Sequence, residues 1–269
     1  MSYAADTMSG MEIDEHIATL ERQGFMLANA ARNAGLDAVV PTCPGWRMRD
    51  LVRHIGYVHR WATGYVAGQL TEEAPELTEA EQLAAGPADD KLTDWFTGGL
   101  TALSDALAQA DPAMTAWTFL DAPSPLAFWA RRQAHETAIH CADAKFAAGH
   151  GHGYPTEFAA DGIDELLIGF FGRNTADAAG SSGGRVLQVC AADAGQAWHV
   201  RLDDGASRVI ATGRGTQQDD SAADCTLIGS ASDLYALLWN RAPLALDAQV
   251  SGEARLLAGW VSNMHVTWG

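Results

Sequence analysis

The chain has few of the features that mark a secreted or membrane-spanning protein. Its 269 residues include four cysteines, and no two of them form a Cys-x-x-Cys pair. Scattered cysteines are typical of reduced thiols in the cytoplasm and not of a disulfide framework. No uninterrupted apolar run reaches the ~18–20 residues that a membrane-spanning helix needs. The first ten residues carry no basic region followed by an apolar one, so we expect a cytoplasmic protein without a secretory signal.

Basic residues are also scarce. Seventeen Lys and Arg stand against 34 Asp and Glu, which leaves a formal net charge of −17. Such a field repels the phosphate backbone of nucleic acids and anionic membrane surfaces, so neither is expected as a partner. An anionic substrate would need a local cation to overcome this field, and individual arginines are therefore candidates for a binding site.

The first half of the chain carries the pattern of amphipathic helices. Apolar residues make up 48% of the sequence, and in this half they recur at spacings of three and four. Helices are predicted at about 11–34, 49–68, 92–110 and 127–148, with a polar connection at 71–90. Four helices of this length indicate a four-helix bundle, a fold that builds metal sites from inward-facing side chains.

The second half has a different character. A further helix is predicted at 156–179 and another at 231–240. Strand-like segments are predicted at 185–190, 197–202, 207–210, 225–228 and 248–251, and the chain closes with segments 253–260 and 265–268. The fold class expected is α+β with two domains, a four-helix bundle over residues 1–152 and a small α+β domain over residues 153–269.

Potential metal ligands lie on two of the predicted helices. In the segment Trp129–Asp143, Glu136 and His140 stand at positions i and i+4, so both leave the same helix face about one turn apart. On spacing alone, an ion pair on the helix surface is the alternative interpretation. His54 is a third candidate, because it shares the inner face of its helix with apolar residues and therefore points toward the core; a hydrogen-bonded core histidine is the alternative interpretation. Three N/O ligands from two helices leave coordination positions open, as catalytic zinc sites do.

The other histidines are interpreted as structural. His135 and His140 are five residues apart and point about 140° apart on a helix, so the His-Glu-x-x-His zinc motif is absent and Glu136 suits a ligand better than a general base. His54 and His59 are also five apart, which predicts that only one of them faces inward. Five more have no partner at ligand spacing: His16, His150, His152, His199 and His265.

Several segments, in order along the chain, resemble one family. Pro41-Thr-Cys-Pro-Gly-Trp-Arg-Met-Arg-Asp-Leu-Val-Arg-His-Ile-Gly and the segment Arg131–Asp143 resemble the two N-terminal signatures of the mycothiol-dependent maleylpyruvate isomerase family. Asp161–Leu167 resembles the start of its C-terminal domain, and Ser232–Arg241 contains that domain's Leu-Tyr-x-x-Leu-Trp-x-Arg pattern. The resemblance covers essentially the whole chain.

This resemblance implies a DinB-like metal-binding bundle followed by a small α+β domain similar to sterol-carrier folds. It implies that His54, Glu136 and His140 bind a divalent metal, for which zinc is expected and nickel, cobalt or iron fit by geometry alone. It also implies mycothiol as a thiol cosubstrate. The metal-bound thiolate would attack an electrophilic small molecule, in a cis–trans isomerisation of the maleylpyruvate type or in an S-transfer.

Three further residues are expected to support the site. Arg241, at the end of a predicted helix, is expected to face the bundle and bind a carboxylate, with a part in catalysis and cofactor binding; capping of its helix is the alternative. Arg132 is expected to support Glu136, four residues further on. Asp50 either accepts the other imidazole N–H of His54 or caps the N-terminus of its helix.

The leading hypothesis is a metal-dependent, mycothiol-using S-transferase or isomerase that acts on a small electrophile, with or without a carboxylate, as a monomer or homodimer. The alternative is a regulatory protein that binds metal or thiol without catalysis. Lipid carriage by the C-terminal domain rests on fold analogy alone. Trp46 is expected to anchor its turn, and Cys43 and Cys141 lack the basic partner that a nucleophilic thiol needs.

Overall fold

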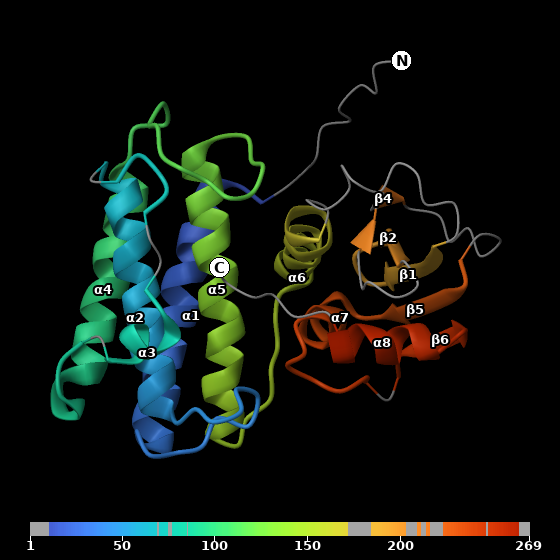
Figure 1. Cartoon of the computed structure of the whole chain (residues 1–269), viewed down its shortest axis with the longest axis horizontal. Coiled ribbons are helices and arrows are strands. Elements are labelled where there is room, and N and C mark those ends of the chain that lie inside the picture. The colour runs from blue at the N-terminus through green and yellow to red at the C-terminus, as the bar shows by residue number, and fades with distance from the viewer. Residues whose placement is uncertain are drawn as a thin grey trace.

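The computed structural model describes residues 11–68, 70–74, 77–84, 86–171, 184–202, 209–210, 214–215, 223–245 and 247–263. These residues form a helical bundle and, beside it, a smaller part in which helices pack against a sheet (Figure 1). The two-part α+β fold predicted from the sequence is therefore confirmed. Among the described helices, none is long and apolar enough to cross a membrane.

Four long helices form the N-terminal bundle. They are α1 (Ile13–Ala34), α2 (Met48–Val66), α4 (Asp89–Gln109) and α5 (Pro125–Ala147). In the bundle α5 packs mainly against α1, and α2 packs mainly against α4. A short helix, α3 (Glu79–Ala84), lies in the segment predicted as a polar connection. Its six residues are too few to show a helical period in the sequence.

Local capping interactions fix where these helices start and stop. Ser124 Oγ accepts a hydrogen bond from the Ala127 N–H at 3.1 Å, and Pro125 occupies the first turn of α5. The Arg47 N–H donates to Asp50 Oδ2 at 2.8 Å at the start of α2. Helix α1 ends at Gly35, whose φ of 81° is in the region that glycine tolerates best.

The C-terminal part begins with a helix that lies between the bundle and the sheet (Figure 1). This helix, α6 (Thr156–Asp164), continues directly into a π-helical turn, η1 (Glu165–Phe170). The predicted helix 156–179 is thus confirmed as far as Phe170, and residues 172–183 lie outside the described ones. Helices α7 (Ala231–Leu238) and α8 (Arg255–Asn263) complete the helical layer.

A mixed sheet forms the other layer. Its strands are β1 (Arg185–Ala191), β2 (Gln196–Leu202), β3 (Val209–Ile210), β4 (Arg214–Gly215), β5 (Cys225–Gly229) and β6 (Gln249–Gly252). They are ordered β3-β2-β1-β5-β6, with β4 also paired to β2. Strands β1 and β5 are parallel, and the other pairs are antiparallel. The predicted strands are confirmed where they are described; residues 207–208 and 265–268 lie outside the described ones.

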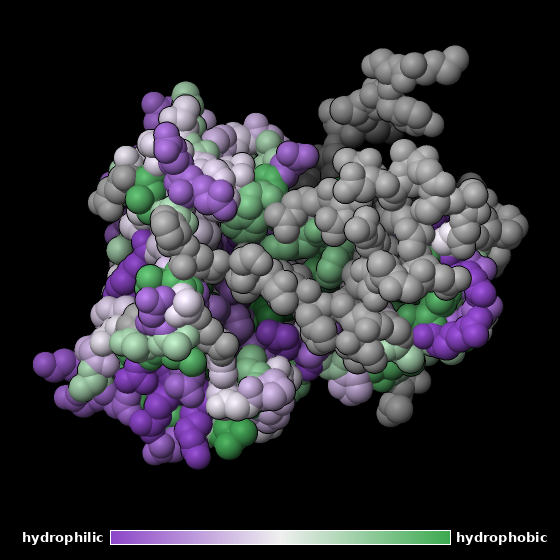
Figure 2. All heavy atoms as spheres, in the orientation of Figure 1, coloured by the Kyte–Doolittle hydropathy of each residue, from purple (hydrophilic) through white to green (hydrophobic). Residues whose placement is uncertain are grey.

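One apolar core runs from the bundle into the C-terminal part. Its buried members include Trp129 and Tyr65 from the bundle and Phe158, Tyr235 and Trp260 from the C-terminal part. A second apolar cluster lies within the bundle, among α1, α2, α4 and α5. On the face seen in Figure 2, the bundle surface is mostly hydrophilic, and hydrophobic residues show where the bundle meets the C-terminal part. The predicted boundary at 152/153 falls in the connection between α5 and α6.

Candidate metal centre

Three side chains from two helices of the bundle converge. His54 on α2 and His140 on α5 both turn Nε2 toward Glu136 Oε1, at 3.5 and 3.3 Å. Their imidazole rings meet edge to face, with centroids 5.0 Å apart. The three potential ligand atoms lie within 4.8 Å of one another, and all three side chains are largely buried. Two nitrogen donors and one oxygen donor at this spacing fit one divalent cation with open coordination positions.

Hydrogen bonds at the far nitrogens hold both imidazoles in the orientation that metal binding needs. His54 Nδ1 lies 3.0 Å from Gln82 Oε1, and His140 Nδ1 lies 2.8 Å from Asp143 Oδ2. Both partners are acceptors, so each Nδ1 carries the proton and donates it. Nε2 is then the atom of each ring that would give up its proton to bind a metal, whereas here each Nε2 faces Glu136 Oε1 as a donor. Burial would lower the pKa of His140, but its hydrogen bonds with Asp143, Cys43 and Glu136 raise it well above its usual value.

Glu136 is held by a second buried ion pair. Arg132 Nη2 lies 3.1 Å from Glu136 Oε2, and Arg132 Nη1 pairs with Glu165 in η1. Burial alone would raise the pKa of Glu136, but hydrogen bonds from His140 and His54 and the charge of Arg132 lower it well below its usual value. Glu136 is therefore an anion at neutral pH and a candidate ligand. The expected support of Glu136 by Arg132 is present.

Asp143 joins several groups around His140. Its Oδ1 accepts from Thr42 Oγ1 at 2.5 Å, and its Oδ2 accepts from Cys43 Sγ at 3.3 Å as well as from His140. Arg241 Nε lies 2.8 Å from Asp143 Oδ1. Burial would raise the pKa of Asp143, but the charge of Arg241 and the bond to His140 lower it to about 2. Asp143 is thus a buried anion that orients a candidate ligand.

Arg241 reaches the bundle from the C-terminal part. It follows α7, and its side chain pairs with Asp143 on α5. Its Nη1 also donates to the Trp239 carbonyl at 3.0 Å, near the end of α7. Arg241 therefore faces the bundle and also donates to a carbonyl at the end of its helix, so it has features of both roles considered from the sequence, binding a carboxylate and capping the helix. The carboxylate that it contacts here belongs to the protein itself.

Aromatic side chains lie against the two imidazoles. The Trp46 ring stacks on His140 with centroids 6.2 Å apart and lies 5.1 Å from His54. The backbone N–H of Trp46 donates to the Cys43 carbonyl at 3.0 Å, which agrees with the expectation that Trp46 anchors its turn. Its ring also covers the candidate ligands. His54 and Glu136 also line a small cavity, together with Tyr57 among others.

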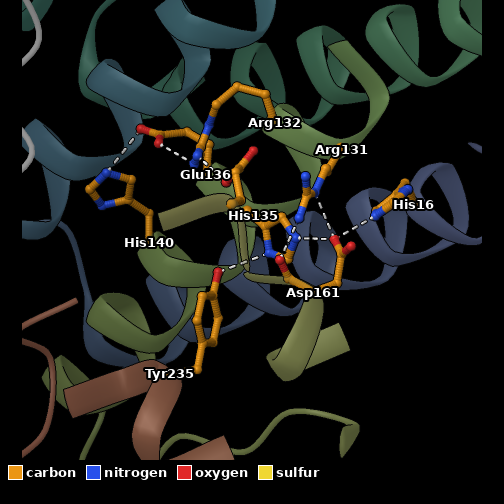
Figure 3. A network of polar contacts seen from close by, with 9 residues as sticks. His16, Arg131, Arg132, His135, Glu136, His140, Asp161 and Tyr235 are labelled. Carbon is orange, nitrogen blue, oxygen red and sulfur yellow. Dashed lines mark hydrogen bonds and ion pairs between the residues drawn. The ribbon is translucent and has the colours of Figure 1, made fainter. Parts of the chain in front are cut away.

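A second polar cluster ties the bundle to the C-terminal part (Figure 3). Asp161 on α6 meets three donors at Oδ2: His16 Nε2 at 3.0 Å, His135 Nε2 at 2.8 Å and Arg131 Nε at 3.0 Å. His135 Nδ1 lies 3.0 Å from the hydroxyl of Tyr235 on α7. His16, His135 and Asp161 lie close enough together to hold a metal, but the negative charge of Asp161 is already balanced by Arg131. Figure 3 shows His135 directed away from Glu136 and His140 on α5.

Two expectations about the helix of His54 are corrected or decided by the structure. Asp50 caps α2 and does not orient His54, because Gln82 accepts that imidazole's proton.

His59 is fully buried together with His54, so the prediction that only one of them faces inward is wrong. Helix α2 packs against α4 on one side and α5 on another, and His59 stacks on Phe96 and bonds Thr137 Oγ1 at 2.8 Å. Burial lowers the pKa of His59 to about 3.

Sequence reasoning missed the two residues that orient the imidazoles. Asp143 lies three residues after His140, a spacing at which side chains on a helix meet, so the signal was present. Gln82 lies on α3, whose own existence the sequence did not indicate. Cys43 was set aside as a nucleophile, and the structure places its thiol beside Asp143.

Comparison with known families matches both halves of the chain. Residues 17–145 match the family described as "Mycothiol maleylpyruvate isomerase N-terminal domain". Residues 157–259 match the family described as "MDMPI C-terminal domain". No curated protein matches the sequence.

Two solved structures share the fold. One is described as the crystal structure of the mycothiol-dependent maleylpyruvate isomerase, with 15% identity and a TM-score of 0.61. The other is described as a histidine-to-alanine mutant of the mycothiol-dependent maleylpyruvate isomerase, with 14% identity and a TM-score of 0.62. Each comparison covers 90% of this chain and 95% of the other. At these identities the likeness shows that the fold is shared over nearly the full length.

Proposed function

This chain belongs to the mycothiol maleylpyruvate isomerase family, and from that premise we propose that it is a metal-dependent enzyme in which mycothiol attacks an electrophilic small molecule. The observation that carries the proposal is the convergence of His54, Glu136 and His140 with both Nε2 atoms turned inward. The family match supports mycothiol as the thiol, and the donor set supports the metal, with zinc as the expected ion.

We assign the metal to these three residues. A divalent cation held there would supply acidity, because a coordinated thiol is deprotonated outright, whereas a free thiol with a pKa of ~8.5 is only a few per cent thiolate at neutral pH. Glu136 contributes the negative charge of the ligand set, and Arg132 keeps it ionised. Gln82 and Asp143 hold the Nδ1 protons of His54 and His140, so that each imidazole is fixed with Nε2 toward the proposed metal.

We propose that the ion pair between Arg241 and Asp143 connects the C-terminal part to the metal site. Arg241 pairs with the carboxylate that orients His140, so it lies one side chain from a proposed ligand. We assign it a part in binding the thiol cosubstrate and in positioning His140. Burial would lower the pKa of Arg241, but the negative charge of Asp143 raises it above its usual value, so the ion pair keeps Arg241 charged.

Two reactions follow from one first step. The thiolate sulfur forms a bond to an electrophilic carbon as the electron pair of the carbon–carbon double bond moves onto the conjugated carbonyl. In an isomerase, rotation about the new single bond and expulsion of the thiolate give the trans product and regenerate the thiol. In an S-transferase, a proton is taken up and the thioether is the product. Incubation with maleylpyruvate and a small amount of mycothiol separates them, because only isomerisation turns over without consuming thiol.

The proposal is tested by calorimetric titration of mycothiol into zinc-loaded protein. We expect binding with release of a proton, seen as a dependence of the heat on the ionisation enthalpy of the buffer. Glu136→Ala should lose zinc and the mycothiol heat together. His199→Ala is the matched control, because His199 contacts Gln188 in the sheet and should leave both unchanged.

A fully zinc-loaded protein that gives no heat with mycothiol would remove the thiol from the proposal. The regulatory alternative would then account better for the site. Equal zinc content in wild type and Glu136→Ala, measured without chelators in purification, would instead contradict the ligand assignment.

A further inference from the structure

The imidazole of His140 has a second polar group at its other edge. Its Nε2 faces the candidate metal centre, whereas its Nδ1 lies 2.8 Å from Asp143 Oδ2. The thiol of Cys43 lies 3.3 Å from the same oxygen. Cys43, His140 and Asp143 thus place one sulfur, one nitrogen and one oxygen within 4.8 Å of one another. This set has His140 in common with the candidate metal centre.

The two carboxylate oxygens of Asp143 have different partners. Oδ1 accepts from Thr42 Oγ1 at 2.5 Å and pairs with Arg241 Nε at 2.8 Å, and both of these groups keep their protons at neutral pH. Oδ2 meets the Cys43 thiol and the Nδ1 of His140. A thiol and an imidazole nitrogen each bind a metal once their proton is lost. Oδ2 therefore faces two potential metal ligands and is itself a third.

The buried cluster around Asp161 lacks this division. His16, His135 and Asp161 also lie within 4.8 Å of one another, but Arg131 Nε lies 3.0 Å from the same Oδ2 that the two imidazoles contact. A guanidinium keeps its protons, so a cation at that oxygen would have to displace Arg131. At Asp143 the guanidinium contacts Oδ1, and the thiol and the imidazole lie on the other side of the carboxylate.

Charge and access also favour a cation beside Cys43. Asp143 is already paired with Arg241, so the thiolate of Cys43 would add a second negative charge beside one guanidinium and attract a cation. Cys43 is partly exposed, whereas His140 and Asp143 are buried, so a dissolved ion has access to the set at its sulfur. The Cys43 N–H donates to the Val40 carbonyl at 3.1 Å, which holds this loop residue in place.

We propose that Cys43, His140 and Asp143 form a second metal site, which binds a thiophilic divalent cation such as zinc or cadmium. The cation would be held by Cys43 Sγ, His140 Nδ1 and Asp143 Oδ2, a mixed set of sulfur, nitrogen and oxygen donors that suits zinc and softer ions. The bonds to sulfur and nitrogen form as their two protons leave to the solvent. The inference does not rest on the proposed function, because it involves no thiol cosubstrate.

The second site would compete with the candidate metal centre for one imidazole. A neutral imidazole has one nitrogen with a free lone pair at a time, so a cation at Nδ1 of His140 leaves the proton on Nε2, which faces Glu136. A thiophilic ion at Cys43 would therefore remove His140 from the candidate centre. Ions that prefer sulfur are thus expected to inactivate the centre without contacting His54 or Glu136.

The test is titration of cadmium into the full chain after removal of metal by dialysis against a chelator. A bond between cadmium and a thiolate gives a charge-transfer absorption in the ultraviolet, which nitrogen and oxygen ligands do not give. We expect this band in the wild type and its loss in Cys43→Ser. His140→Ala should weaken the cadmium affinity measured from the band by more than ~100-fold, because even residues behind a metal ligand contribute about 10–100-fold.

Two variants provide the controls. Cys141→Ala removes the buried thiol that follows His140 directly and lies outside the proposed set, and it should keep the band. Glu136→Ala, which removes a ligand of the candidate centre alone, should also keep it. The change from Cys43 to serine replaces one atom of a partly exposed loop residue, and circular dichroism verifies that each variant is folded.

The proposal is overturned if cadmium gives no charge-transfer band in the wild type, or if Cys43→Ser keeps the band. Loss of the band in Glu136→Ala would show that the thiol serves the candidate centre and would overturn a separate site. None of these outcomes depends on mycothiol. A protein that shows the expected cadmium band and gives no heat with mycothiol would contradict the thiol mechanism and leave the second site intact.

Discussion

At the scale of single residues, the candidate centre depends on side chains that form hydrogen bonds with the candidate ligands on the side away from the proposed metal. The i,i+4 spacing of Glu136 and His140 and the resemblance around His54 were sufficient to nominate the three ligands from sequence. The residues that orient these candidate ligands could not all be predicted from the sequence. Asp50 was one nominee for orienting His54, but its carboxylate is used by the first turn of α2, and an amide 28 residues away takes the role.

Asp143 supplies a prediction at this scale. Asp143→Asn should weaken zinc binding by about 10–100-fold, because the amide cannot anchor the His140 proton and the Arg241 charge as the carboxylate does. Competition with a chromogenic chelator measures the affinity. Asp50→Asn is the matched control and should leave zinc affinity unchanged. Equal losses in the two variants would show that Asp143 has no special part in orienting the ligand.

At the scale of elements, helix α2 is central because it is packed on more than one side. Gly56 lets α2 approach the Trp95 ring of α4, and a Cβ at this position would overlap that ring. The ring is also covered by the guanidinium of Arg60, 3.8 Å from its centroid. The apolar period predicted α2 well, but it could not show that both of its histidines are buried, because this depends on which helices cover it.

We expect Gly56→Ala to destabilise the protein by about 1–3 kcal/mol, since the Trp95 ring must move. Gly98→Ala is the matched control on α4, where an added Cβ meets nothing within 4 Å. It should stabilise by about 0.5–1 kcal/mol through helix propensity. Urea unfolding followed by circular dichroism measures both changes, and a neutral Gly56→Ala would contradict the tight packing of α2 on α4.

At the scale of the whole molecule, the two parts are joined by buried polar contacts as well as by a shared apolar core. Asp161 links α1, α5 and α6 through His16, His135 and Arg131, and Arg241 links the C-terminal part to α5. The sequence predicted both parts and their fold class. It could not predict the Asp161 cluster, because its members lie on separate helices with no spacing that relates them.

This cluster predicts how stability depends on pH. Burial would raise the pKa of Asp161, but bonds from His135 and His16 and the charge of Arg131 lower it well below its usual value of 3.8. A carboxyl group whose pKa is lower in the folded state contributes stability above pH 3.8 that is lost as the pH falls toward the folded pKa. We expect Asp161→Asn to lose about 3 kcal/mol at pH 7 and to show a shallower decline below pH 4. Denaturant unfolding at several pH values measures both.

Asp105→Asn, at an exposed carboxylate on α4, is the control for that series and should keep the wild-type profile. An Asp161→Asn variant with wild-type stability at pH 7 would contradict a stabilising role for the cluster.

The contact between Arg241 and Asp143 also bears on how such chains evolve. The two family matches end and begin on either side of residues 146–156, which makes this connection an obvious point for recombination between genes. A crossover there would import a C-terminal half that has to supply both an arginine for the buried carboxylate of Asp143 and a matching apolar surface. The two halves are therefore expected to be inherited together, and a chimaera of distant relatives should lose the geometry of the candidate metal centre before it fails to fold.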